Sequence, residues 1–214
     1  MSGPAFADLY ASITTDLSNQ GYAVSDHCDT LLAERLAQQL GVVTGGWQTL
    51  TPKQEDAAHP WSLSGRYGLG RFPWHIDGAV ASVPPKLLVM QCISASAVSE
   101  PTQLLDFMHE STLDAAQLLS KVVLRARDKT GWVRYLPAII HSNGKPMLRW
   151  DPRTCEVVDP QWQRVANVID DTPPTAEVAW LPGRVAFIDN RRNLHRRPPI
   201  TTTAPRELVR LYVH

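Results

Sequence analysis

Three side chains that commonly bind transition metals occur in an informative pattern. His75 and Asp77 are two positions apart in the segment 74–78. In an extended chain, alternate side chains point to the same side, so both could bind one ion. His195 follows an apolar run, 185–188, that is typical of a buried strand. Two imidazoles and one carboxylate form the facial triad that leaves open positions on a ferrous ion.

The same three side chains leave other functions open. Two histidines and a carboxylate can also hold Zn(II), where a bound water becomes the nucleophile of a hydrolase. A non-catalytic metal-binding module would keep the site without turning over a substrate.

Two arginines close to the C-terminus are suited to bind an anion. Arg206 and Arg210 stand four positions apart around the start of a predicted strand, 208–213. Even spacing in a strand puts both guanidinium groups on one face. A guanidinium is well shaped to hold a carboxylate through two parallel hydrogen bonds. The sequence therefore offers a carboxylate-binding pair in addition to the metal-binding triad.

Together, these segments resemble the Fe(II)/2-oxoglutarate-dependent oxygenases of the taurine dioxygenase (TauD/TfdA) and clavaminate synthase type. The resemblance covers most of the chain. It comprises the opening segment 21–41, the motif at 75–78, the Pro84-Pro85 pair before an apolar strand, the segment 183–195 and the terminal arginine strand.

The resemblance implies a reaction and a set of site residues. A small-molecule substrate would be hydroxylated or desaturated, with O2 as cosubstrate and with release of succinate and CO2. The residues that it implies are His75, Asp77 and His195 for Fe(II), and Thr102, Arg206 and Arg210 for 2-oxoglutarate. The arginine at the cofactor position favours this dioxygenase over the zinc hydrolase and the non-catalytic module. The implied fold is α+β, with a double-stranded β-helix (a jelly-roll, cupin-like core) and flanking helices.

The periodicity of the chain agrees with an α+β domain built on a β-sandwich or barrel. The predicted helices are 6–17, 31–40, 114–119 and 159–169. The predicted strands are 21–25, 86–93, 122–125, 134–140, 147–150, 177–180, 185–188 and 208–213. Asp29 or Thr30 is suited to cap the second helix. Asn143-Gly144 is a strong signal for a hairpin turn.

The segment Thr44–Ser64 is predicted to be a long loop, because its periodicity disappears among glycines, prolines and polar residues. Ordered loops of this length usually bind or cover something. We therefore expect a substrate-gating lid, with His59 and Trp61 as substrate contacts. Arg149 is a further candidate substrate contact, because its hairpin should lie near the mouth of the barrel.

Composition limits the class of protein. The 214 residues include 21 basic and 21 acidic side chains, and this balance argues against a nucleic-acid or membrane binder. We expect the arginines at 191, 192, 196 and 197 to form a solvated corner. Three scattered cysteines, and the lack of an apolar stretch long enough to cross a membrane, predict a cytoplasmic protein. Residues 1–214 are expected to form one domain that acts on an amino acid or another small anionic metabolite, and the sequence predicts no particular oligomeric state.

Overall fold

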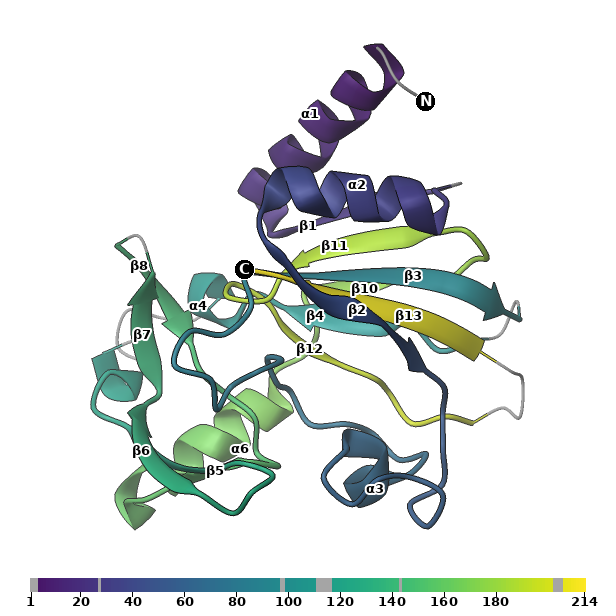
Figure 1. Cartoon of the computed structure of the whole chain (residues 1–214). Coiled ribbons are helices and arrows are strands. Elements are labelled where there is room, and N and C mark those ends of the chain that lie inside the picture. Colours follow the sequence, from purple (N-terminus) through teal and green to yellow (C-terminus); the bar gives the residue numbers. More distant parts are fainter. Residues whose placement is uncertain (1–3, 27, 97–98, 111–116, 143, 202–205) are drawn as a thin grey trace.

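The computed structural model describes residues 4–26, 28–96, 99–110, 117–142, 144–201 and 206–214 (Figure 1). Its helices are α1 (Pro4–Gln20), α2 (Thr30–Leu40), α3 (Leu63–Tyr67), α4 (Phe107–Glu110), the 3-10 helix η1 (Pro160–Trp162) and α6 (Gln163–Asp171). Its strands are β1 (Tyr22–Ser25), β2 (Val43–Leu50), β3 (Leu87–Ala95), β4 (Thr102–Leu105), β5 (Val123–Arg127), β6 (Val133–Pro137), β7 (Ile139–Ser142), β8 (Lys145–Leu148), β9 (Cys155–Val157), β10 (Ala176–Val178), β11 (Val185–Asp189), β12 (Leu194–Arg196) and β13 (Arg206–Val213). In this described part of the chain, no helix combines the length and the apolar character needed to span a membrane.

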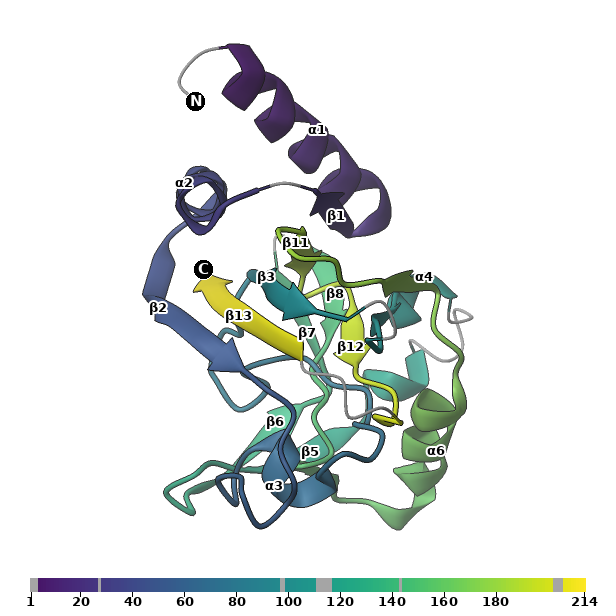
Figure 2. The ribbon, with the colours of Figure 1, turned by 90° about the vertical axis from the view of Figure 1, so that its right-hand side faces the viewer.

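Helices α1 and α2 cover one face of a five-stranded antiparallel sheet with the order β1-β11-β3-β13-β2 (Figures 1 and 2). Successive side chains of a strand point to opposite faces, and β3 shows the consequence. Leu87 and Val89 pack with Leu36 of α2, whereas Leu88 and Met90 belong to the core on the other side. The almost continuous apolar run of β3 is thus explained by burial on both faces.

The second face of this sheet packs against a three-stranded antiparallel sheet, β10-β4-β12. Leu104 of β4 and Val178 of β10 share a buried core with Leu88 and Leu208 of the larger sheet. The molecule therefore has a layer of helices, a large sheet and a small sheet. The ladders of the described strands remain separate sheets, and they do not form the closed double-stranded β-helix that the resemblance implied.

A third core lies beside the two sheets and contains the sheet β6-β5-β9, the hairpin β7-β8 and α6 (Figure 2). Trp74 and Ile76 are fully buried in this core. His75 and Asp77 alternate with them, so their side chains are directed away from it. The third core therefore fixes the orientation of His75 and Asp77, two of the three predicted metal ligands.

Most of the predicted elements are confirmed. Asp29 caps α2, because its Oδ1 accepts a hydrogen bond of 2.7 Å from the Leu32 amide. The predicted strand 134–140 is divided into β6 and β7, and short strands β4, β9 and β12 were not predicted. Residues 114–116 of a predicted helix and Asn143 of the predicted turn lie outside the described residues.

The prediction of a continuous loop over Thr44–Ser64 is wrong at both ends. Residues up to Leu50 form β2, which pairs with β13, and residues 63–67 form α3. The Gly45-Gly46 pair does not end the strand. An irregularity between Arg210 and Tyr212 of β13 shifts the pairing register at the two glycines, and β2 pairs with β13 on both sides of it. The loop proper is therefore shorter and follows β2.

Candidate active site

The site is built around a pairing between His75 and His195. The His75 amide donates to the His195 carbonyl at 3.2 Å, and the His195 amide donates to the His75 carbonyl at 2.9 Å. This isolated antiparallel bridge joins the segment before β3 to β12, the edge strand of the small sheet. The two imidazole centroids lie 4.3 Å apart. Backbone hydrogen bonds thus bring together two histidines that are distant in the sequence.

Asp77 completes the cluster. Its Oδ1 lies 3.9 Å from His75 Nε2 and 3.9 Å from His195 Nε2. One ligand atom from each of the three residues lies within 4.8 Å of the others. All three side chains are buried, with exposed fractions of 3%, 7% and 6% for His75, Asp77 and His195. The predicted metal-binding residues are therefore assembled, with both Nε2 atoms directed at the carboxylate.

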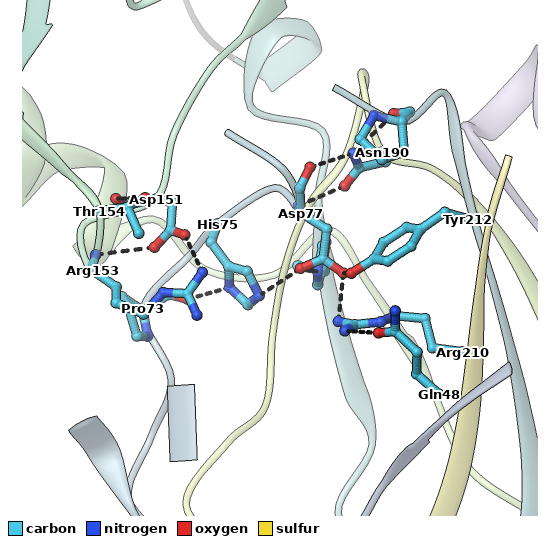
Figure 3. A network of polar contacts seen from close by, with 12 residues as sticks. Gln48, Pro73, His75, Asp77, Asp151, Arg153, Thr154, Asn190, Arg210 and Tyr212 are labelled. Atoms are coloured by element: carbon cyan, nitrogen blue, oxygen red, sulfur yellow. Dashed lines mark hydrogen bonds and ion pairs between the residues drawn. The ribbon is translucent and has the colours of Figure 1, made fainter. Parts of the chain in front are cut away.

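Local contacts set the protonation of the two imidazoles. His75 Nδ1 lies 2.9 Å from the Pro73 carbonyl oxygen, which can only accept, so Nδ1 carries the proton and Nε2 keeps a lone pair (Figure 3). Burial, followed by the nearby His75, lowers the pKa of His195 to about 3. His195 is therefore neutral at neutral pH, and in His75 the ring atom that faces the carboxylate and can bind a metal ion is Nε2.

Asp77 is held at its backbone and at its side chain (Figure 3). The Asn190 amide group accepts from Asp77 N–H at 2.8 Å and donates to the Asp77 carbonyl at 3.0 Å. Asp77 Oδ2 accepts from Arg210 Nη1 at 2.7 Å and from the Tyr212 hydroxyl at 3.2 Å. Burial opposes ionisation of Asp77, but the charge of Arg210, together with smaller contributions from the two histidines and Arg153, outweighs it and holds the pKa well below its ordinary value. Oδ1 remains directed at the imidazoles.

A cavity of about 440 Å³ opens beside the three ligands. Thr102 and Arg206 line it together, and both are at least nine-tenths buried. Thr102 Oγ1 accepts a hydrogen bond of 3.0 Å from the Trp180 indole, which orients the hydroxyl. Arg206 Nη1 donates to the Glu100 carbonyl. Thr102 and Arg206, two of the three predicted 2-oxoglutarate residues, thus share a cavity with the triad, and the third, Arg210, also lines it.

Of the predicted substrate contacts, only His59 lines this cavity. Trp61 is 37% exposed and is not among the described lining residues. Arg149 is buried elsewhere, where its guanidinium donates to the carbonyls of Ala79, Ala81 and Ser82. We expected Arg149 near the mouth of the barrel as a substrate contact. Its guanidinium instead stabilises the turn that follows Asp77, and Arg149 is not among the described residues that line the cavity.

The expectation of a solvated arginine corner is wrong, because its four arginines are buried or half-buried. The Arg196 guanidinium lies over the Trp74 ring, 4.0 Å from its centroid, and that of Arg197 lies 3.8 Å from the Phe72 centroid. Both arginines line the cavity. Burial and the neighbouring Arg206 lower the pKa of Arg197 to about 10, so it stays charged at neutral pH.

Arg153 is a cavity residue that sequence reasoning missed. Its Nη2 forms an ion pair of 2.8 Å with Asp151 (Figure 3). Its Nη1 donates to the Trp61 carbonyl at 2.7 Å. The charge of Arg153 also contributes to lowering the pKa of Asp77. The only sequence signal was its position just after the predicted strand 147–150, close to Arg149, which we had named as a candidate substrate contact.

No family model and no curated protein matches the sequence. Solved structures do match. An asparagine oxygenase in complex with Fe(II), 2S,3S-3-hydroxyasparagine and succinate is 17% identical, with a TM-score of 0.76 over 97% of this chain and 79% of the other. A taurine dioxygenase from Burkholderia xenovorans is 18% identical, with a TM-score of 0.74 over 96% and 81% of the two chains.

A third structure, the non-heme iron oxygenase OrfP in complex with Fe, succinate and (3S)-hydroxy-L-Arg, is 19% identical. Its TM-score is 0.72 over 99% of this chain and 80% of that one. The chain therefore has the fold of non-heme iron, 2-oxoglutarate-dependent oxygenases of the taurine dioxygenase type. The resemblance inferred from the sequence is confirmed at the level of the fold.

Proposed function

We propose that this protein is an Fe(II)- and 2-oxoglutarate-dependent dioxygenase that hydroxylates or desaturates a small molecule, with release of succinate and CO2. One observation carries the proposal. The triad His75, Asp77 and His195 lies on the wall of the same cavity as the buried pair Thr102 and Arg206. A zinc hydrolase or a metal-binding module has no need of that second pair.

The donor set fits Fe(II). Two neutral imidazole nitrogens and one ionised carboxylate are the ligands expected for this ion in oxygenases. His75, Asp77 and His195 would hold it, and the bound iron with 2-oxoglutarate and O2 supplies the oxidising chemistry. The Pro73 carbonyl and Asn190 orient His75 and Asp77, as outer partners of metal ligands commonly do.

The second carboxylate of 2-oxoglutarate would bind Arg206 and Thr102. Arg206 is 9% exposed, so a carboxylate bound there would be removed from water, where a charge-assisted hydrogen bond is strong. Arg210 has a different role from the one implied by the resemblance. Because its Nη1 is engaged by Asp77 and its Nη2 by Gln48 at 2.8 Å, we assign it to positioning the metal-binding carboxylate.

The fold and the likeness to the oxygenases support two further parts of the proposal. The sheets β1-β11-β3-β13-β2 and β10-β4-β12 would correspond to the two faces of a double-stranded β-helix, with the triad between them. Residues 1–214 would act as one catalytic domain. A cytoplasmic location stays a prediction, supported by three buried cysteines that remain free thiols.

Succinate production tests the proposal. The purified protein is incubated with Fe(II), 2-oxoglutarate and O2, and in parallel with Zn(II) in place of iron. We expect succinate only with iron, and its loss in His195→Ala but not in His141→Ala, a matched change at an exposed histidine. Equal succinate formation by wild type and His195→Ala would contradict the assignment of the triad.

A further inference from the structure

The cavity carries a large excess of positive charge. Six cationic side chains line it, namely Lys53, Arg153, Arg196, Arg197, Arg206 and Arg210. Among the described lining residues, the only carboxylate is Asp77. A positive cavity with walls of low dielectric attracts anions and repels cations. The charge therefore restricts which substrates can enter.

Three of these cations, Arg196, Arg197 and Arg206, are bound by neutral partners, whereas Arg153 and Arg210 pair with carboxylates. Arg197 Nη2 donates to the carbonyls of Gly68 and Gly70 at 2.7 and 2.8 Å, and Arg206 donates to the Glu100 carbonyl. Carbonyl oxygens satisfy the N–H donors without cancelling the net charge. The cationic character of the cavity is therefore retained at neutral pH.

2-Oxoglutarate would account for only part of this charge. Its distal carboxylate would lie at Arg206, on β13. Arg153 comes from the turn between β8 and β9 instead, where Asp151 and the Trp61 carbonyl hold its two terminal nitrogens. Its Nε is buried and has no hydrogen-bond partner among the described residues. Arg153 is thus a positioned cation that the cosubstrate would not use.

An ammonium group would have no counterpart in this cavity. Asp77 is engaged by Arg210 and Tyr212 and would bind the metal, so no carboxylate among the described lining residues is left to pair with it. A free amino acid would bring its ammonium group into a positive field without a partner. Two of the similar structures contain amino-acid ligands, hydroxyasparagine and hydroxy-L-Arg, so the charge predicts a different substrate class here.

We propose that the substrate is a small organic anion without a free ammonium group, and that Arg153 binds its carboxylate or sulfonate. This inference rests on the proposed function and specifies the substrate class of the same site. Guanidinium groups recognise such anions through two parallel hydrogen bonds, and Arg153 would reach this geometry by exchanging the Trp61 carbonyl for the ligand. The loop that contains Trp61 would respond to binding for the same reason.

Anaerobic titration tests the substrate class. The protein loaded with Fe(II) and 2-oxoglutarate is titrated with three free amino acids, namely asparagine, leucine and phenylalanine. It is also titrated with their N-acetyl derivatives, which lack the ammonium group, and with their carboxamides, which lack the carboxylate. Alkyl carboxylates and sulfonates complete the set of anions. The readouts are the visible absorption band of the iron complex and the midpoint of thermal unfolding. We expect the ammonium-free anions to perturb the band at concentrations at least about tenfold below those of the free amino acids. The carboxamides should have no effect.

Variants assign the effect to Arg153. Arg153→Gln should weaken the response to anions by about tenfold or more, while 2-oxoglutarate binding stays within about twofold of wild type. The single variant leaves the buried Asp151 carboxylate without its partner. If that variant does not fold, the double variant Asp151→Asn/Arg153→Gln, which removes this carboxylate, is used in its place. Arg125→Gln is the matched control, because Arg125 pairs with Glu156 away from the cavity.

Three results would overturn the inference. One is a stronger response to a free amino acid or its carboxamide than to the N-acetyl derivative. Another is the absence of any response to the anions while 2-oxoglutarate still binds, which would leave the proposed function intact. A third is failure of 2-oxoglutarate to bind at all, which would instead overturn the proposed function together with this inference.

Discussion

His75 and His195 exchange both of their backbone hydrogen bonds, at 3.2 and 2.9 Å, although they come from separate parts of the fold. The pairing places their rings 4.3 Å apart. A preformed site loses less conformational entropy on binding than one that must assemble. The two histidines are therefore fixed by the backbone, and the aspartate is adjusted to them by its side-chain partners.

Replacing Arg206 should weaken 2-oxoglutarate binding selectively. Arg206→Ala removes the buried guanidinium that would face the distal carboxylate and should cost on the order of 2–5 kcal/mol of binding free energy. Anaerobic titration of the Fe(II)-loaded variant with 2-oxoglutarate measures this cost. Metal affinity should be unchanged, and Arg125→Ala provides the control. Equal 2-oxoglutarate affinity in Arg206→Ala and wild type would refute this role.

Replacing Arg210 should instead weaken metal binding. Loss of its ion pair with Asp77 removes the largest of the charges that lower the carboxylate's pKa, so the pKa of Asp77 should rise and acid should expel the metal at higher pH. We expect Arg210→Gln to lower Co(II) affinity by about 10–100-fold in the absence of 2-oxoglutarate. Tyr212→Phe, which removes the longer contact, should have a smaller effect. Unchanged metal affinity together with weakened 2-oxoglutarate binding in Arg210→Gln would show that Arg210 binds the cosubstrate instead.

The stability of the metal-free protein should depend on His195 at acidic pH. In the unfolded chain this imidazole binds a proton below about pH 6.5, whereas in the folded protein its pKa is lowered to about 3. The unfolded state therefore binds more protons between these values, and stability falls as pH falls through this range. Between about pH 6.5 and 5 this single group should remove about 2 kcal/mol from the free energy of unfolding. Urea denaturation of wild type and His195→Asn measures the difference, and an identical pH dependence in both would show that His195 is not the group responsible.

The loop between β2 and α3 should act as a lid. Its middle residues are exposed, and the Trp61 carbonyl is tied to Arg153 by one hydrogen bond. Exposed backbone with few contacts exchanges its amide hydrogens readily. Hydrogen exchange of residues 51–62 should be fast in the metal-free protein and slower once Fe(II), 2-oxoglutarate and an anionic ligand are bound. Slow exchange in both states would mean that this segment is a fixed part of the scaffold.

The parts of the fold that were predicted correctly carry local signals. The capped helix α2 has its Asp29 cap, and the apolar run of β3 reflects burial on both faces. His75 and Asp77 were found because alternate positions in an extended segment face one side, and His195 because it follows an apolar run typical of a buried strand. These features depend on neighbouring residues, so the sequence alone is sufficient to predict them.

The parts that were missed depend on distant partners. β12 has three residues and is stabilised by pairing with β4, and β2 continues through two glycines because β13 pairs with it. Arg197 is buried because Phe72 and two backbone carbonyls surround it, although a charged residue is usually exposed. Arg153 reaches the cavity through its contacts with Asp151 and the loop. None of these environments is encoded in the adjacent sequence.

The most direct test of the central claim is anaerobic loading of the purified protein. Fe(II) is added to the wild type and to Asp77→Ala, binding is measured by equilibrium dialysis, and 2-oxoglutarate is then added while the visible spectrum is recorded. We expect one Fe(II) per wild-type chain, a new visible absorption band when 2-oxoglutarate is added, and neither result in Asp77→Ala. Stoichiometric iron binding and the same absorption band in Asp77→Ala would contradict the central claim.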